Sequence, residues 1–273
     1  MERPIGSIIG NIRNKGFFHT IRRNSYLPYQ LPFAMQVVEA IGKDRNPKFR
    51  IDNENRFVYE NLIRWIHGDQ DFKCIDPATK EVIPGRLTAG IYIAGNTGSG
   101  KSWALEIMSA YCDIDNVQVT IGNEQFCLRW PCFRSDTICE EFTEKGSIDK
   151  YKKRAILGIQ DLGSNSEPIE SLYMGNRMGV IQQLLEYRGD FTDKITLITS
   201  NLPMNHKVLI DRYGDRVASR LNEMCNYFEI KGKDRRKTYS IDNKLSLFVI
   251  LPTLATTILL SFKYSLPTTL KYS

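Results

Sequence analysis

The chain is poor in the side chains that build zinc sites. Its 273 residues include only three histidines, and its six cysteines lie at positions 74, 112, 127, 132, 139 and 225. The one cluster, Cys127, Cys132 and Cys139, lacks the two-residue spacing of a zinc knuckle and has no histidine nearby. We therefore expect buried or partly buried free thiols in a reducing cytoplasm rather than a structural zinc site.

Acidic residues are scarce at the N-terminus. The first 30 residues contain five Arg or Lys and a single acid, Glu2, which faintly resembles a transit peptide, but a basic irregular arm is the preferred interpretation. The whole chain carries a formal net charge of +6. An excess of this size permits contact with nucleic acid without requiring it, and the alternative is that it only aids solubility.

Long apolar runs are missing, with one exception near the C-terminus. Leu245–Phe262 has 18 residues without a charge, which is a borderline length for a membrane span. Pro252 and five Ser or Thr residues within the run argue against a span. We interpret it as an irregular or strand-forming tail and not as a membrane segment, and a membrane-tethered protein is the alternative.

One octapeptide carries most of the chemical information that is present. Residues 95–102 match the phosphate-loop pattern G-x-x-x-x-G-K-[ST], and all eight are candidate nucleotide-binding residues: Gly95, Asn96, Thr97, Gly98, Ser99, Gly100, Lys101 and Ser102. Such a loop turns backbone N–H groups toward a phosphate, and the following helix points the positive end of its dipole at the same place. Lys101 would reach the β- and γ-phosphates of ATP, and Ser102 would hold Mg²⁺.

The surroundings of this octapeptide favour a phosphate loop over a glycine-rich turn that matches by chance. Residues 90–94 are short, apolar and bounded by glycine, as expected of a buried strand. After Lys101, apolar side chains recur at helical spacing at Leu105, Met108, Tyr111 and Cys112. A strand before the loop and a helix after it are the context that the pattern requires.

Strand and helix signals alternate through the second half of the chain. Strands are expected at 117–121, 155–159 and 195–199, and helices at 136–144, 178–188 and 209–224. This alternation predicts an α/β fold with a parallel sheet flanked by helices. The expected segments are an irregular basic arm (1–31), a small helical, partner-binding N-terminal segment and linker (32–88), an ATPase domain (89–241) and an apolar tail (242–273).

Two apolar strands end in polar residues that suit phosphate chemistry. The strand from Ala155 ends at Asp161, which would support Mg²⁺ or orient the attacking water; the alternative is a turn or capping aspartate. The strand 195–199 leads to Asn201. If this strand lies between the loop strand and the acid strand, Asn201 would hold the attacking water near the γ-phosphate, whereas Asn-Leu-Pro is also an ordinary turn.

Two arginines are spaced four residues apart near the end of the domain. Arg216 and Arg220 would share one face of a helix. An arginine presented to the γ-phosphate of a neighbouring subunit stabilises charge in the transition state. The alternative is a solvated basic face.

Taken in this order, the motifs resemble the AAA+ ATPases of the DnaC/IstB type, which are helicase loaders and transposition helpers. The resemblance covers about Ile51–Lys237 and looks closest to versions on phages and mobile elements. Besides the phosphate loop it rests on five stretches: 159–163, similar to the family's Ile-Asp-Asp-Leu-Gly, Glu167-Pro168 with the helix 173–188, 199–201, 216–221 and 232–236.

The resemblance implies a cytoplasmic ATPase that binds ATP and Mg²⁺, assembles with copies of itself, and acts on a replicative DNA helicase and single-stranded DNA. It assigns Asp161, Asn201 and Arg220 to catalysis. Gln160 stands where the family usually has the first acid of a pair, so hydrolysis is expected to be slow, and an acid restored there would be expected to raise turnover. The alternatives are a transposition helper on duplex DNA and an ATP-dependent adaptor with little hydrolysis.

Overall fold

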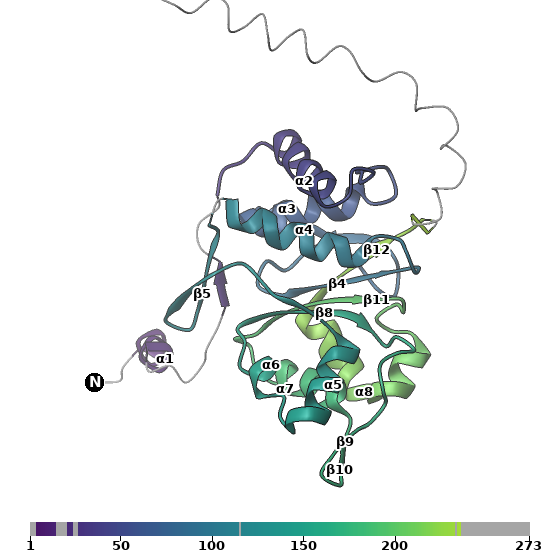
Figure 1. The fold of residues 1–273 in the computed structure, drawn as a ribbon. Helices are drawn as coiled ribbons and strands as arrows, with labels where there is room; N and C mark the ends of the chain where they lie inside the picture. Colours follow the sequence, from purple (N-terminus) through teal and green to yellow (C-terminus); the bar gives the residue numbers. More distant parts are fainter. Residues whose placement is uncertain (1–3, 15–20, 24–26, 115, 233, 236–273) are drawn as a thin grey trace, which may run out of the picture. The chain divides into compact units, whose positions relative to one another are not determined.

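A mostly parallel sheet organises the computed structural model, which describes residues 4–14, 21–23, 27–114, 116–232 and 234–235 (Figure 1). Within these residues, seven strands pair in the order β3-β2-β12-β4-β11-β8-β7. They are β2 (Lys73–Ile75), β3 (Val82–Pro84), β4 (Gly90–Gly95), β7 (Cys132–Arg134), β8 (Ile156–Leu162), β11 (Ile195–Ser200) and β12 (Cys225–Ile230). The strands from β12 to β7 pair in parallel, and β2 and β3 extend the sheet antiparallel.

Helices cover both faces of this sheet, as the sequence predicted (Figure 1). On one face lie α2 (Leu31–Arg45), α3 (Arg56–His67) and α4 (Lys101–Ile114), and on the other α5 (Ser135–Lys145), α6 (Asp149–Lys152), α7 (Val180–Gly189) and α8 (Lys207–Met224). Successive strand residues point to opposite faces. Ile91 and Ile93 of β4 therefore pack with the first group, and Tyr92 and Ala94 with the second.

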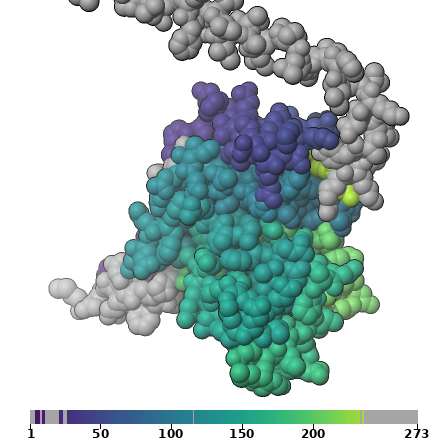
Figure 2. All heavy atoms as spheres, in the orientation of Figure 1, coloured from purple at the N-terminus to yellow at the C-terminus, as the bar shows by residue number. Residues whose placement is uncertain are grey.

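The helices of the first group pack against one another as well as on the sheet. Contacts join α2 to α4 and to α3, and the space-filling view shows α2 and α4 side by side (Figure 2). Helix α3 lies in the segment 32–88 that was expected to be helical, and it ends at Gly68 in the left-handed conformation that favours glycine. The helix expected at 136–144 is likewise confirmed as α5, which Gly146 ends.

The N-terminal region is more regular than the sequence indicated. We expected an irregular arm over 1–31, but its described residues include α1 (Ile5–Asn14) and β1 (Ile21–Arg23). β1 pairs antiparallel with β5 (Gln118–Ile121), which pairs with β6 (Glu124–Cys127). A three-residue strand whose partner lies about 100 residues away leaves no periodic pattern in its own sequence.

Other strands were not expected from the sequence either. The linker expected within 32–88 contains β2 and β3, and β12 was not expected because its sequence mixes Asn226 and Glu229 with apolar residues. A hairpin of β9 (Ser171–Tyr173) and β10 (Asn176–Met178) precedes α7.

Residues 1–233 form one unit and 234–273 a second. No helix within the described residues is long and apolar enough to cross a membrane, and the apolar run Leu245–Phe262 lies outside them.

Candidate nucleotide-binding site

The phosphate-loop sequence connects a strand to a helix, as predicted. β4 ends at Gly95 and α4 begins at Lys101. Between them, Gly98 and Gly100 have φ angles of 78° and 97°. Residues with a Cβ rarely adopt such angles, so the turn that joins this strand to this helix depends on glycine at these positions. The N-terminus of α4, with its unpaired backbone N–H groups, therefore lies at the loop.

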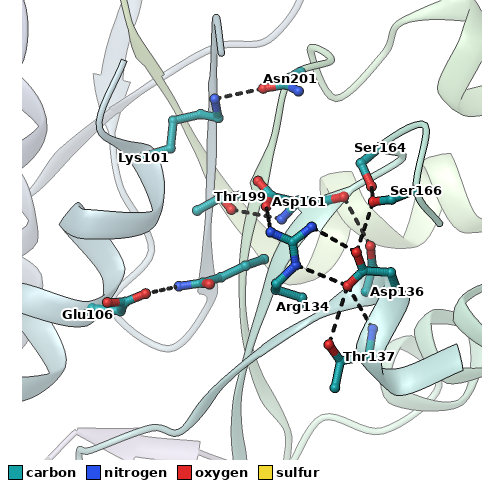
Figure 3. A network of polar contacts seen from close by, with 12 residues as sticks. Lys101, Glu106, Arg134, Asp136, Thr137, Asp161, Ser164, Ser166, Thr199 and Asn201 are labelled. Atoms are coloured by element: carbon teal, nitrogen blue, oxygen red, sulfur yellow. Dashed lines mark hydrogen bonds and ion pairs between the residues drawn. The ribbon is translucent and has the colours of Figure 1, made fainter. Parts of the chain in front are cut away.

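Lys101 is buried at the start of α4, with 5% of its surface exposed. Its Nζ donates hydrogen bonds to the carbonyl oxygens of Gly95 and Asn96, both at 2.8 Å, and to Oδ1 of Asn201 at 2.9 Å (Figure 3). The structure thus brings together two residues that the sequence singled out 100 positions apart.

The position of Asn201 follows from the strand order. β11 lies between β4 and β8 and pairs in parallel with both, as the sequence interpretation required. The carboxyl ends of the three strands therefore meet at one edge of the sheet. Thr199 of β11 accepts a hydrogen bond through Oγ1 from the backbone N–H of Asp161 at 3.1 Å, which ties the acid strand to the same edge.

Asp161 adopts an uncommon backbone conformation near the end of β8, with φ of 58°. Such a conformation in a residue other than glycine is often found at functional sites. Its side chain is 30% exposed, and Oδ2 lies 3.3 Å from Nη1 of Arg134 (Figure 3). The carboxylate is therefore held in an ion pair at the surface of the site.

Arg134 is a site residue that sequence reasoning missed. Its guanidinium also donates to both carboxylate oxygens of Asp136, at 3.1 and 2.8 Å. These bonds, more than any other cause, hold the pKa of Asp136 well below its ordinary value. In the sequence, Arg134 stands just before an expected helix and belongs to no motif, so no local signal indicated it.

Gln160 is 7% exposed, and its carboxamide is hydrogen-bonded. Nε2 donates to Oε1 of Glu106 on α4 at 2.7 Å (Figure 3). The other carboxylate oxygen of Glu106 pairs with Arg45 of α2. A polar chain therefore links α2, α4 and β8 beside the phosphate loop. Glu106 carried no signal in the sequence, because it reads as a polar position on an amphipathic helix.

Glu167, which resembles the acid that follows the pair in the family, is 3% exposed and bound on several sides. It accepts hydrogen bonds from the backbone N–H of Gly163 at 3.0 Å, from Nε of Arg212 at 3.1 Å, and from the hydroxyl of Tyr213. Burial, with this carboxylate beside it, raises the pKa of Tyr213. Glu167 thus fastens the loop after β8 to α8.

The two arginines of α8 share one helix face, as predicted. Arg216 and Arg220 both donate to Asp190, at 3.0 and 2.7 Å, and Arg220 also donates to Glu223 at 2.9 Å. Their side chains are 61% and 31% exposed. Within one chain, both guanidinium groups are therefore bound to acids.

The donor set around the loop suits a phosphate group. Ser99 is 1% exposed, and its hydroxyl oxygen has no hydrogen-bond partner within the part of the chain that the structure describes. An orphaned hydroxyl, the Lys101 ammonium and a helix N-terminus are all groups that bind anions. The Ser102 hydroxyl and the Asp161 carboxylate are oxygen donors of the kind that Mg²⁺ prefers.

No protein-family model and no curated protein matches the chain. Some solved structures do, each covering 68% of it. A proposed primosome component of Streptococcus pyogenes serotype M3 has a TM-score of 0.44 and 17% identity, over 84% of its own length. The DnaC helicase loader scores 0.41 with 16% identity over 95%, and the replication initiator DnaA bound to AMPPCP and single-stranded DNA scores 0.43 with 16% identity over 49%. These values are too low to assign the chain to a family.

Proposed function

We propose that this chain is an AAA+ ATPase of the helicase-loader type, which binds ATP and Mg²⁺ at Gly95–Ser102. The observation that carries the proposal is the position of Lys101, whose ammonium group contacts both the phosphate loop and Asn201 at the carboxyl ends of β4 and β11. A motif match alone would not require the loop lysine to meet a polar residue of the neighbouring strand.

In this proposal the phosphates of ATP bind at the Gly98–Gly100 turn and at Lys101. Ser102 and Asp161 hold Mg²⁺, whose charge neutralises the phosphate oxygens. Asp161 and Asn201 orient the attacking water, and Arg220 of a second copy contacts the γ-phosphate. We expect slow turnover, because Gln160 supplies no charge and Asp161 is held by Arg134.

The partners follow from the resemblance rather than from the site. We propose that the bound nucleotide controls the affinity of the protein for single-stranded DNA and for a replicative helicase. The segment 32–88 is proposed as the partner-binding part. The protein would act in the cytoplasm as an assembly of several copies, in a replication system of a phage or mobile element. The bounds of the four segments remain a proposal, although residues 1–31 include α1 and β1, and residues 32–88 include β2 and β3 of the main sheet.

The proposal is tested by nucleotide-dependent binding of single-stranded DNA. Fluorescence anisotropy of a labelled oligonucleotide is measured with ATP, with ADP and without nucleotide. We expect affinity that depends on ATP in the unaltered chain and in the surface control Lys153→Ala, and loss of that dependence in Lys101→Ala. Binding that ignores nucleotide in all three proteins would contradict a loader.

An ATP-dependent adaptor with little hydrolysis is the second candidate. It is favoured by the pairing of Asp161 with Arg134, which holds that acid in an ion pair, and by Gln160, which supplies no negative charge and is bound to Glu106. Steady-state phosphate release separates the two. An ATPase releases phosphate, and Asp161→Asn abolishes the release while ATP still binds. An adaptor binds ATP with no release above the blank.

A further inference from the structure

Glu106 occupies a place that neither the phosphate-loop pattern nor the acid strand accounts for. It lies on α4, one turn after Ser102, and its carboxylate accepts the hydrogen bond from Gln160 at 2.7 Å. The side chain of Glu106 is 28% exposed and that of Gln160 is nearly buried. A carboxylate thus stands directly against the strand position at which an acid was expected and glutamine was found.

Helix geometry relates this carboxylate to the metal-binding end of the loop. Residues four apart on a helix lie on one face, with about 5–6 Å between their Cβ atoms, so Ser102 and Glu106 are neighbours. Side chains on a helix also lean toward its N-terminus, which for α4 is Lys101. Glu106 therefore lies on the same face of α4 as Ser102, one turn from it.

We propose that Glu106 supplies from α4 the negative charge toward Mg²⁺ that Gln160 does not supply from β8. Mg²⁺ keeps several of its waters and is usually bound through one or two carboxylates together with phosphate oxygens. Glu106 acts on the waters that Mg²⁺ keeps, and Asp161 is the other acid. The inference deepens the proposed function and rests on it.

Gln160 and Arg45 each bind one carboxylate oxygen of Glu106. Gln160 donates to one carboxylate oxygen and so fixes its orientation, as groups behind a metal ligand commonly do. Arg45 pairs with the other oxygen. Gln160 is then a positioning residue, and glutamine is better than aspartate there because two facing carboxylates would repel.

The rival explanation is that Arg45, Glu106 and Gln160 only join three elements. The two explanations differ in Mg²⁺ dependence. A structural tie affects folding, whereas a charge near the ion changes the Mg²⁺ concentration at which the nucleotide complex is half-saturated. Glu106→Gln removes the charge but keeps the size and an acceptor oxygen for Gln160. Arg45→Gln is the matched control, since it breaks the tie to α2 and leaves the carboxylate.

The experiment measures binding of a fluorescent ADP analogue in EDTA and across a Mg²⁺ titration, with thermal melting to check the fold. Loss of groups that support a metal ligand costs about 10–100-fold in metal affinity. We expect half-saturation at roughly tenfold higher Mg²⁺ in Glu106→Gln, unchanged affinity in EDTA, and a smaller shift in Arg45→Gln. Equal half-saturation in the unaltered chain and a folded Glu106→Gln protein would overturn the proposal.

The exchange variant Glu106→Gln/Gln160→Glu keeps the test decisive if the single variant unfolds. It returns one carboxylate and one carboxamide to the same pair, on opposite partners. We expect this variant to be half-saturated at a Mg²⁺ concentration within about threefold of that for the unaltered chain, which is well below the cost of losing a supporting group. A folded exchange variant that needs at least tenfold more Mg²⁺ would overturn the proposal. Failure of the unaltered chain to bind nucleotide even in Mg²⁺ would instead refute the proposed function, and the inference with it.

Discussion

At the scale of single residues, Lys101 is the side chain on which the nucleotide site depends most. Its buried ammonium donates to three neutral acceptors, two backbone carbonyls and the amide oxygen of Asn201. A phosphate is a stronger acceptor, because its oxygens carry negative charge and attract the ammonium by Coulomb interaction as well as by hydrogen bonding. ATP is therefore expected to draw Lys101 away from Asn201 and to release that amide for water.

Gln160 is the residue at which the structure changes our prediction. From the sequence, an acid at this position was expected to raise turnover. In the structure, Gln160→Asp would remove a donor and turn a carboxylate toward Glu106. We now expect no gain in phosphate release and a loss of about 1–3 kcal/mol in the free energy of unfolding, measured in urea. Gln160→Asn, which keeps the amide, is the control, and faster release from a fully stable Gln160→Asp protein would refute this prediction.

At the scale of elements, the strands that could be predicted were continuous apolar runs in the sequence. The loop strand β4, the acid strand β8 and the strand β11 were all expected, and their order explains the meeting of Lys101 with Asn201. The short strands β1, β2, β3 and β7 were not, since a strand of three residues is too short to show a periodic pattern in its own sequence.

Site residues that are placed only by tertiary contacts could not be predicted from the sequence either. Arg134 and Glu106 act through tertiary contacts to Asp161 and Gln160, and nothing in their own neighbourhoods in the sequence indicates this. The loop lysine and the strand-end amide could be predicted, because each follows directly from a local pattern.

The junction of α5 and α6 gives a prediction about pH. Glu141 of α5 accepts from Lys145 at 2.6 Å and also from Lys150 and Tyr151 of α6, and these bonds lower its pKa to about 2. Because the folded pKa lies below the unfolded one, the stabilisation is present above about pH 4.5 and is lost as the pH falls toward 2.

We therefore expect Glu141→Gln to weaken the protein at pH 7 and to flatten its stability profile between pH 4.5 and 2. Urea unfolding at a series of pH values measures this. Glu144→Gln is the control, because it alters a neighbouring acid of the same helix whose side chain is exposed. Parallel profiles for the unaltered chain and Glu141→Gln would show that the junction contributes nothing to acid stability.

At the scale of the whole molecule, the proposed arginine finger requires more than one copy of the chain. Within one chain Arg220 is bound to Asp190 and Glu223. As a finger it would leave these acids for the γ-phosphate of a neighbour, and its loss would cost about 10³-fold or more in turnover. Arg216→Ala should cost less if it only braces the helix.

Mixing two inactive variants tests this shared site. Arg220→Ala lacks the finger and Lys101→Ala lacks the loop cation, but a mixed assembly contains some sites with both. We expect partial recovery of phosphate release on mixing, and none when either variant is mixed with itself. No recovery in a mixture shown to co-assemble would count against a composite site and favour the adaptor.

The central claim is that Gly95–Ser102 binds nucleotide, and the most direct test is titration with a fluorescent ATP analogue. Lys101→Ala removes the cation at the β- and γ-phosphates, and circular dichroism verifies that the fold is kept. We predict affinity at least about tenfold lower in Lys101→Ala and unchanged affinity in the surface control Lys153→Ala, because only the first lysine contacts phosphate. Equal affinity in the unaltered chain and a folded Lys101→Ala protein would contradict the account.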